Sequence, residues 1–425
     1  MELVIMILGV IILIFTGLPV AFSLGLASLS YFLMNPLPLG VISQSITKGS
    51  DSFIMLALPL FIASGTIMNK TGITDRIFRF SNNLVGHIPG GLGHVNVVVN
   101  MVFAGMSGSI LADVGGVGQV LIKVMKKKGF NPGFSAAVTS ASALIAPIIP
   151  PSILFVVYGG LTGTSIGALF VAGAIPGVLM GIFLMVAVYI ISVKRNYPIE
   201  ERASFLELIK SFYAALPAFL TPIIIVGGML AGIFTPTESS AIACIYAIFL
   251  GLVYKEITLK SFLKIAYSVV TTTSSIMFLL AMAKLFSWIL IREQAGLILV
   301  NAITSFSDNT FIILLLLVLV ALFLGCFMDA ATNLIIIMPL LMPLLTSLGV
   351  NMVYFGVFFV ITLAVGSMTP PVGMGMYLAS SIAEIQITDF LKEAYPFIAA
   401  LMVCVFLLML FPIITLWLPS FFYSF

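Results

Sequence analysis

Long uninterrupted apolar runs fill most of this chain, and polar residues are confined to short segments between them. A run of roughly 20 apolar residues is long enough to cross a bilayer as a helix. Continuous runs, rather than alternation with a period of two, predict an all-α polytopic membrane protein. The runs that fit a membrane span are 3–15, 19–34, 51–69, 132–160, 165–193, 214–234, 238–254, 265–290, 353–382 and 394–420.

Two apolar segments, 91–128 and 308–349, do not fit a single span. Each has two apolar legs, too short to cross comfortably, around a polar tip at residues 107–113 or 329–333. This pattern predicts a re-entrant helical hairpin, which is tolerated at membrane depth only where protein or water covers its tip. Segment 72–85 predicts an amphipathic helix lying in the membrane interface.

The two halves of the chain repeat each other at a shift of 220 positions, which places Pro150-Pro151 on Pro370-Pro371. We therefore expect two structural repeats, each with a re-entrant hairpin followed by a Pro-Pro broken helix. Most of the other matched residues are glycine, proline or asparagine, which determine backbone shape: Phe103 with Phe323, Gly105 with Gly325, Asp113 with Asn333, Gly129 with Gly349, Asn131 with Asn351 and Pro176 with Pro396.

The paired prolines interrupt spans 132–160 and 353–382. Proline has no N–H and releases the carbonyl four residues earlier, so oxygens are freed at mid-membrane depth and a sodium ion can satisfy them. The helix that resumes at Ser152 or Val372 offers free N–H groups to an anion. A simple kink is the alternative. Paired broken segments in two halves, however, are typical of the binding site of a secondary transporter.

Asp113 and Asp329 lie deep in apolar sequence. A membrane-buried carboxylate costs roughly 2.5–3.5 kcal/mol on insertion scales, so each is a functional candidate. Capping of a hairpin helix is the alternative for either residue. Each tip combines its carboxylate with neutral oxygens, a composition that suits a weak Na⁺ site: Ser107 and Ser109 in the first, and Thr332 and Asn333 in the second.

The distribution of Lys and Arg predicts the orientation of the chain. We expect the lysine run 126–128 and the charged segment 194–213 in the cytoplasm, whereas residues 293–391 contain no Lys or Arg. The two hairpins then enter from opposite faces, so the repeats are inverted. The N-terminus falls outside if 3–15 is a separate span, and one kinked span over 3–34 is the alternative.

These features divide the chain into three parts. The first inverted repeat covers 1–193, with hairpin 91–128 and broken helix 132–160. A cytoplasmic linker covers 194–213. The second inverted repeat covers 214–425, with hairpin 308–349 and broken helix 353–382.

Composition excludes several classes of function. Hydrophobic residues make up 61% of 425 and charged residues 8%, whereas soluble chains carry about 25% charged residues. A net charge of +3 without a basic stripe does not indicate nucleic-acid binding. The sequence has neither a phosphate-binding loop nor a catalytic constellation, so we expect no ATP hydrolysis and no enzyme. Cys244, Cys326 and Cys404 lack metal spacing, so we expect no transition metal and no cofactor besides Na⁺ as coupling ion.

Several motifs together resemble the large membrane subunit of the tripartite ATP-independent periplasmic (TRAP) transporters, the DctM-like family. The resemblance implies an elevator-type ion-transporter fold, Na⁺-driven uptake across a bacterial inner membrane, a small four-helix membrane partner and a periplasmic substrate-binding protein. Because the motifs begin almost at Met1, we expect the small partner to be a separate chain. The motifs are residues 58–61 (LPLF) with Gly65, 105–109 (GMSGS) with 112–113 (AD), 146–152 (APIIPPS), 169–173 (LFVAG) with 176–177 (PG), 232–238 (GIFTPTE) and 369–371 (TPP).

Carried over by position, the resemblance implies two sodium sites and a substrate site between them. The first tip, Asp113-Val114-Gly115-Gly116-Val117-Gly118, is richer in glycine than the family pattern. The first sodium site would use Ser107, Gly108, Ser109, Asp113 and the backbone at Ala146, and the second Asp329, Thr332, Asn333, Gly366, Ser367 and Thr369. The substrate carboxylate would lie near Ser109, Pro151, Ser152, Asp329 and Pro371.

The sequence thus predicts secondary active, Na⁺-coupled uptake of a small organic acid delivered by a binding protein. One alternative is a stand-alone Na⁺/dicarboxylate symporter that needs no binding protein. Another is a channel, which would need a continuous polar stripe in place of two focal clusters. The sequence does not distinguish a C4-dicarboxylate from sialic acid or another sugar acid as the substrate.

Overall fold

The protein is all-helical in the part of the chain that the structure, a computed structural model, describes: residues 2–50, 53–69, 71–307, 309–370 and 372–423. The all-α prediction is therefore confirmed. By length and composition, six helices of this part could cross a membrane: α11 (Ile166–Arg195), α12 (Phe205–Leu230), α13 (Pro236–Val253), α14 (Leu259–Arg292), α17 (Ala330–Ser347) and α20 (Ile387–Leu410).

Shorter helices complete both halves. In the first half they are α1 (Glu2–Phe15), α2 (Val20–Met34), α3 (Gly40–Ser50), η1 (Phe53–Leu56), α4 (Ala57–Met68), α5 (Ile73–Val85), α6 (Gly91–Ser107), α7 (Ile110–Asp113), the π-helical turn η2 (Val114–Gly118), α8 (Gln119–Lys127), α9 (Pro132–Ala143) and α10 (Ile153–Thr162). In the second half they are α15 (Ala295–Phe306), α16 (Thr310–Gly325), α18 (Met352–Gly366), α19 (Met374–Ala383), α21 (Pro412–Leu416) and η3 (Pro419–Phe421).

Helix starts recur at the shift of 220 positions. Helices α7 and α17 begin at 110 and 330, and α9 and α18 begin at 132 and 352. The turns before α9 and α18 use the same chemistry. Gly129 and Gly349 have φ values of 86° and 62°, a region that favours glycine. The side chains of Asn131 and Asn351 then accept hydrogen bonds from the first turns of α9 and α18.

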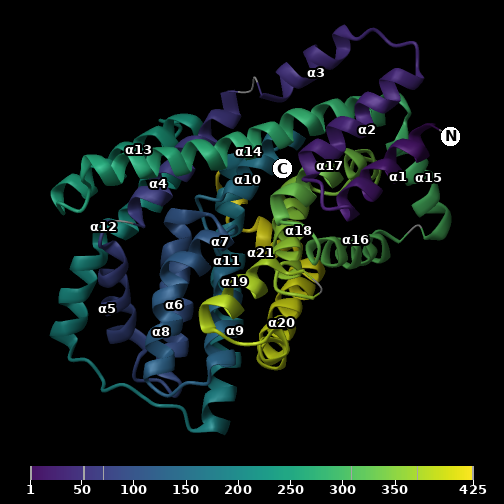
Figure 1. The fold of residues 1–425 in the computed structure, drawn as a ribbon. Coiled ribbons are helices and arrows are strands. Elements are labelled where there is room, and N and C mark those ends of the chain that lie inside the picture. Colours follow the sequence, from purple (N-terminus) through teal and green to yellow (C-terminus); the bar gives the residue numbers. More distant parts are fainter. Residues whose placement is uncertain (1, 51–52, 70, 308, 371, 424–425) are drawn as a thin grey trace.

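One layer of the molecule consists of α1–α4, α13 and α14 (Figure 1). Helix α14, with 34 residues, runs along this layer and packs against α2, α3 and α4, and α4 packs against α13. A stacked Phe32–Trp288 pair, with ring centroids 5.5 Å apart, joins α2 to α14. The layer is therefore a continuous bar across one side of the helix bundle.

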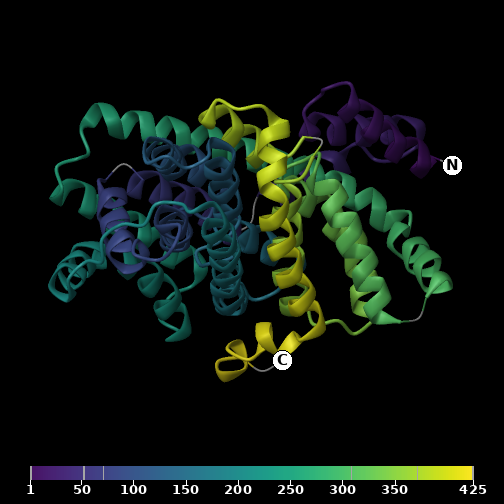
Figure 2. The same cartoon turned by 90° about the horizontal axis from the view of Figure 1, so that it is seen from below.

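The second layer contains α6–α11 and α16–α20, with α9 and α18 at its centre. Almost every residue of α9 and α18 is buried, as expected for helices without a polar face. Helix α9 consists largely of Ala, Ser and Gly, small residues that allow close approach of neighbouring helices. Helices α11 and α20 pack against each other along the outside of this core (Figure 2).

The two halves exchange partners at the broken helices. Helix α10 of the first half packs against α17 of the second, and α19 of the second half packs against η2, α8 and α9 of the first. Tyr158 of α10 donates a hydrogen bond to the Met352 carbonyl over 2.7 Å. Lys126 of α8 donates to the Ala383 carbonyl at the end of α19 over 2.8 Å. At each break, the helix that follows the break therefore packs against helices of the other half of the chain.

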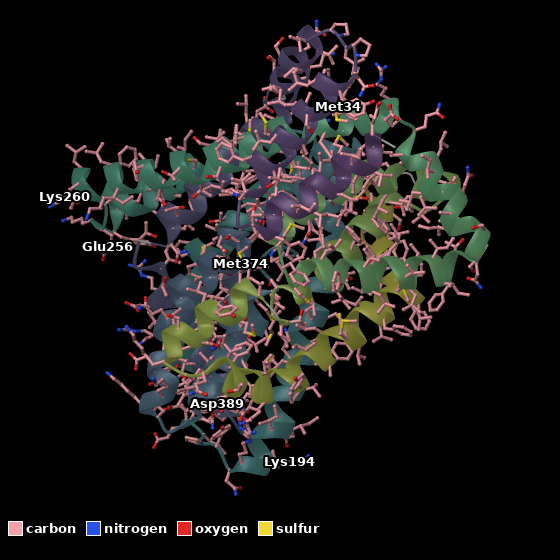
Figure 3. The ribbon with its side chains drawn as sticks, turned by 45° about the vertical axis from the view of Figure 1, so that its right-hand side comes forward. Met34, Lys194, Glu256, Lys260, Met374 and Asp389 are labelled. Carbon is pink, nitrogen blue, oxygen red and sulfur yellow. The ribbon has the colours of Figure 1, made fainter. Side chains whose placement is uncertain are left out.

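Charged residues gather at one end of the second layer. Lys128 pairs with Glu200 at 2.9 Å, and Arg195 pairs with Glu393 at 2.7 Å. Lys194 and Asp389 lie at this end in Figure 3, far from Met34. The contacts bring the segments around the ends of α8 and α11 and the start of α20 to the same side of the protein, although they are far apart in sequence.

Several predicted boundaries are wrong. The expected span 394–420 ends as a helix at Leu410, because Pro412 cannot continue it. The expected span 214–234 begins earlier, at Phe205 of α12, because Ser204 and Glu207 start this helix with a capping box. Helices α3 and α15 were not expected. The two legs of a hairpin were expected to be too short to cross, but α17, with 18 residues, is long and apolar enough to do so.

Candidate functional site

The two hairpin tips begin their second legs with equivalent caps. Ser109 caps α7, and its hydroxyl accepts from the Ala112 N–H over 3.5 Å. Asp329, 220 residues later, caps α17 through Oδ1, which accepts from the Ala331 and Thr332 N–H groups over 2.9 and 3.1 Å. Its Oδ2 accepts from the Thr332 hydroxyl. Capping, the alternative considered for either aspartate, therefore describes Asp329.

Asp113 has a different role, because it caps no helix and is fully buried. Neither of its carboxylate oxygens has a hydrogen-bond partner among the described residues. The amide oxygen of Asn333, its counterpart in the second half, is likewise buried without a partner in this part of the chain. The Asn333 amide nitrogen donates to the Met328 carbonyl over 3.1 Å. The two tips thus carry matched, unsatisfied acceptor oxygens.

The first break, between α9 and α10, is held by Ser152. Its hydroxyl donates to the Pro147 carbonyl over 2.5 Å and accepts from the Phe155 N–H over 3.0 Å, so it caps α10. The first tip packs directly on this break. A Cβ added at Gly108 would come within 2.7 Å of the Pro151 carbonyl oxygen, and φ of Gly108 is 60°. Glycine is therefore required at this contact.

The second break, between α18 and α19, is tied to Cys326 at the end of α16. The Cys326 carbonyl accepts from the N–H groups of Val372 and Gly373 over 3.1 and 2.9 Å. Its sulfur lies 2.9 Å from the Thr369 hydroxyl, which donates to the Gly366 carbonyl over 2.7 Å. The loop at the second break is therefore anchored to the second hairpin.

Gly366 serves close helix packing. A Cβ added there would come within 2.6 Å of the Gly325 Cα, and one added at Gly325 within 2.8 Å of the Gly366 Cα. The backbones of α16 and α18 touch at this point. Only glycine fits at positions 325 and 366, because any side chain there would collide with the facing backbone.

A cavity of about 480 Å³ lies where both tips, both breaks and the bar helix α14 meet. Gly108 and Ser109 line it from the first tip, Asp329 from the second, and Pro147 and Ser367 from the breaks. Ligand pockets typically have volumes of about 300–1,000 Å³. This cavity is therefore the candidate substrate site.

The predicted site residues separate into two groups. Gly108, Ser109, Asp329 and Ser367 line the cavity. Pro371 lies outside the described residues. The remaining residues lie behind the cavity surface, where they form or support the tips and breaks: Ser107, Asp113, Ala146, Pro151, Ser152, Thr332, Asn333, Gly366 and Thr369.

Sequence reasoning missed one wall of the cavity. Thr271, Thr272 and Ser275 of α14 also line it. The signal was present, because residues 271–275 read TTTSS inside an otherwise apolar span. It was overlooked because it lies outside both hairpins and both breaks. No cluster of three or more His, Cys, Asp or Glu residues exists in the described chain.

An apolar helix bundle with two capped tips and two broken helices around a central cavity has the architecture of a membrane transporter. The family model for the DctM component of the tripartite ATP-independent periplasmic transporters matches residues 7–414, and the chain belongs to this family. It is a multi-pass membrane protein of the large-permease type, and the predicted resemblance is confirmed.

Relatives with similar sequences are also named as permease proteins of TRAP transporters. The chain is 42% identical over 412 residues to the sialic acid TRAP transporter large permease protein SiaM of Vibrio cholerae, with 96% of each chain covered. It is 34% identical over 400 residues to the C4-dicarboxylate TRAP transporter large permease protein DctM of Pseudomonas aeruginosa, with 94% of each covered. It is 36% identical to the sialic acid TRAP transporter permease protein SiaT of Haemophilus influenzae, covering 67% of SiaT. These relatives are permeases, not enzymes.

The fold itself also has a solved counterpart. The crystal structure of the YdaH transporter of Alcanivorax borkumensis is similar to it with a TM-score of 0.64. The similarity covers 88% of each chain at 13% sequence identity. At this identity the comparison shows a shared fold.

Proposed function

We propose that this chain performs Na⁺-coupled secondary uptake of a small organic acid across a bacterial inner membrane. The observation that carries the coupling proposal is the buried carboxylate of Asp113, which lacks a hydrogen-bond partner within the described chain. Buried charges in proteins are paired or bind a cation. The matching unsatisfied oxygen of Asn333 supports a second cation site in the other half.

The division of labour between the tips follows from their hydrogen bonds. The oxygens of Asp113 and Asn333 are free to bind ions, whereas those of Asp329 already accept from the start of α17. Asp329 lines the cavity, so its charge acts on the substrate and on nearby ions together. Two ions per substrate is therefore the minimum. Two Na⁺ with a dianion would be electroneutral, and two with a monoanion electrogenic.

Movement of the second helix layer along the bar would carry the cavity across the membrane, an elevator mechanism. This proposal is supported by the two-layer architecture and by the cavity between the layers (Figure 1). The inverted orientation of the two halves is part of it, since alternating access in such folds uses two related halves of opposite topology.

Partners and substrates are proposed from the relatives. Names such as "large permease protein" and the longer SiaT support a small membrane subunit, here proposed as a separate four-helix chain. A periplasmic substrate-binding protein would deliver the acid. The named relatives support sialic acid, a C4-dicarboxylate or another sugar acid as the substrate. The stand-alone symporter would need no delivery protein.

Proteoliposomes containing this chain, its small subunit and the binding protein test the proposal. An imposed Na⁺ gradient should drive uptake, whereas a pH gradient in Na⁺-free buffer should not. Asp113→Asn keeps the shape of the side chain but removes its charge. It should raise the Na⁺ concentration for half-maximal uptake by about tenfold or more, as expected for loss of an ion-site interaction.

Three results would contradict parts of this proposal. Accumulation driven by pH alone would exclude Na⁺ coupling. Unchanged Na⁺ dependence in Asp113→Asn would exclude that residue as an ion ligand. Full uptake without the binding protein would favour the stand-alone symporter.

A further inference from the structure

Helix α14 contributes four residues to the cavity lining, and all but Ile276 carry a hydroxyl group. Thr271, Thr272 and Ser275 are exposed and line the cavity. Residues three and four positions apart are neighbours on one face of a helix, so Ser275 lies beside both Thr271 and Thr272 on the part of α14 that lines the cavity. Ser274 is also exposed but does not line the cavity.

The Thr271 and Ser275 hydroxyls are arranged as hydrogen-bond acceptors. The Thr271 hydroxyl donates to the Tyr267 carbonyl over 2.8 Å, and the Ser275 hydroxyl donates to the Thr271 carbonyl over 3.0 Å. A hydroxyl has one hydrogen to donate and two lone pairs. With the hydrogen used within the helix, the oxygens remain free to accept hydrogen bonds from a ligand.

Other residues of the cavity lining also provide acceptors. The Ser367 hydroxyl donates to the Ala364 carbonyl over 2.7 Å, so its oxygen has lone pairs left to accept. Asp329 contributes a carboxylate, which only accepts while it is ionised. None of the lining residues is Lys, Arg or His. Apart from the Ser109 and Thr272 hydroxyls, whose hydrogens form no bond within the described chain, the polar side chains of the lining offer acceptors to the ligand. They include no cationic group that would neutralise a carboxylate.

This composition discriminates between classes of organic acid. Ligand hydroxyl groups can donate to the free oxygens, whereas a carboxylate cannot. A carboxylate of the ligand can accept from the Ser109 and Thr272 hydroxyls, from backbone N–H groups or from bound cations. A second carboxylate would face Asp329 and the Thr271 and Ser275 oxygens. The volume of about 480 Å³ also leaves room for a ligand with several hydroxyl-bearing carbons.

We propose that the α14 face of Thr271, Thr272 and Ser275 binds the hydroxyl groups of a polyhydroxylated monocarboxylic acid and selects such acids over four-carbon diacids. This inference rests on the proposed uptake function and assigns a specificity role to the bar layer. The hairpin tips would bind the carboxylate and the ions, and α14 would bind the hydroxyl groups of the ligand.

The test compares three variants in the complex of this chain with its small subunit. The double variant Thr272→Val/Ser275→Ala removes two cavity hydroxyls with little change in shape. Thr271→Val removes the third. Ser274→Ala, the matched control, removes an exposed hydroxyl of the same helix that does not line the cavity. Titration calorimetry in Na⁺ buffer measures binding of sialic acid and of succinate, and thermal unfolding checks that each variant is folded.

We expect the wild type to bind sialic acid more tightly than succinate. Each lost cavity hydroxyl should weaken sialic acid binding by about two- to tenfold, the range for one net hydrogen bond. Succinate binding and the Ser274→Ala variant should be unchanged.

Tighter wild-type binding of succinate, or wild-type affinity of the folded double variant for sialic acid, would overturn the inference. Wild-type uptake in the proteoliposome assay separates the two proposals. If Na⁺-driven uptake occurs and the α14 variants bind normally, only this inference fails. If the wild type takes up no organic acid under a Na⁺ gradient, the proposed function fails as well.

Discussion

At the scale of single residues, the two acidic tips do different work despite their similar appearance in sequence. Ser109 and Asp329 occupy equivalent capping positions, and Asp113 and Asn333 occupy equivalent buried positions. One carboxylate therefore replaces a hydroxyl at a cap, and the other replaces an amide at a buried oxygen site. The first tip therefore carries its charge at the buried position, and the second tip carries its charge at the helix cap.

Asp329→Ala should abolish Na⁺-driven uptake while the chain remains folded. The change removes the cavity carboxylate and also the α17 cap, which contributes about 1 kcal/mol to stability. Asp329→Asn separates the two effects, because asparagine caps helices well but is neutral. Uptake should be lost in both variants, and the thermal midpoint should fall only in the alanine variant. Wild-type uptake in Asp329→Asn would show that Asp329 serves the cap alone.

At the scale of helices, the breaks depend on close backbone contacts. Helices α16 and α18 touch through Gly325 and Gly366, one residue before the second break begins. Helices this close leave no room for a side chain. The position of the break is therefore coupled to the packing of the hairpin that carries Asp329.

Gly366→Ala should force α16 and α18 apart and displace the second break. Overpacking of a tight contact costs about 1–3 kcal/mol, so the thermal midpoint of the purified protein should fall and uptake should decrease. Gly227→Ala in α12 is the control, since no atom lies within 4 Å of its added Cβ. That change should be neutral or slightly stabilising, because alanine favours helices over glycine. Equal midpoints for both variants would contradict the packing argument.

At the scale of the whole molecule, the charged ends identify a common face. The segments at Lys128, Arg195 and Glu393 meet through ion pairs, so they lie on one side of any membrane that the protein crosses. An excess of Lys and Arg marks the cytoplasmic side. The opposite orientation of the two hairpins remains a prediction about how the halves sit in the bilayer.

Single cysteines report that orientation. Lys127 and Asn309 are both exposed, one at the end of α8 and the other at the start of α16. A membrane-impermeant maleimide should label Lys127→Cys only from the cytoplasmic face and Asn309→Cys only from the outside. The wild type, with its own cysteines, gives the background signal. Labelling of both variants from the same side would exclude inverted repeats.

The sequence by itself determined the helical class, the repeat and the family. These depend on local rules that need no tertiary context. Apolar runs have to be helical in a bilayer because backbone groups need partners there. Glycine and asparagine before α9 and α18 specify the same turn twice, since few residues adopt a left-handed backbone. Specific motifs then pointed to the family that the comparison confirms.

Only the tertiary structure decided which polar groups meet. Sequence placed Asp113 and Asp329 at tips but could not show that Asp329 is occupied as a cap while Asp113 is unpaired. The sequence did not identify Thr272 and its neighbours as cavity residues. They reach the cavity because α14 packs against tips and breaks that are distant from it in the sequence. Whether an oxygen is free to bind a ligand depends on every neighbour around it, and those neighbours come from both halves of the chain.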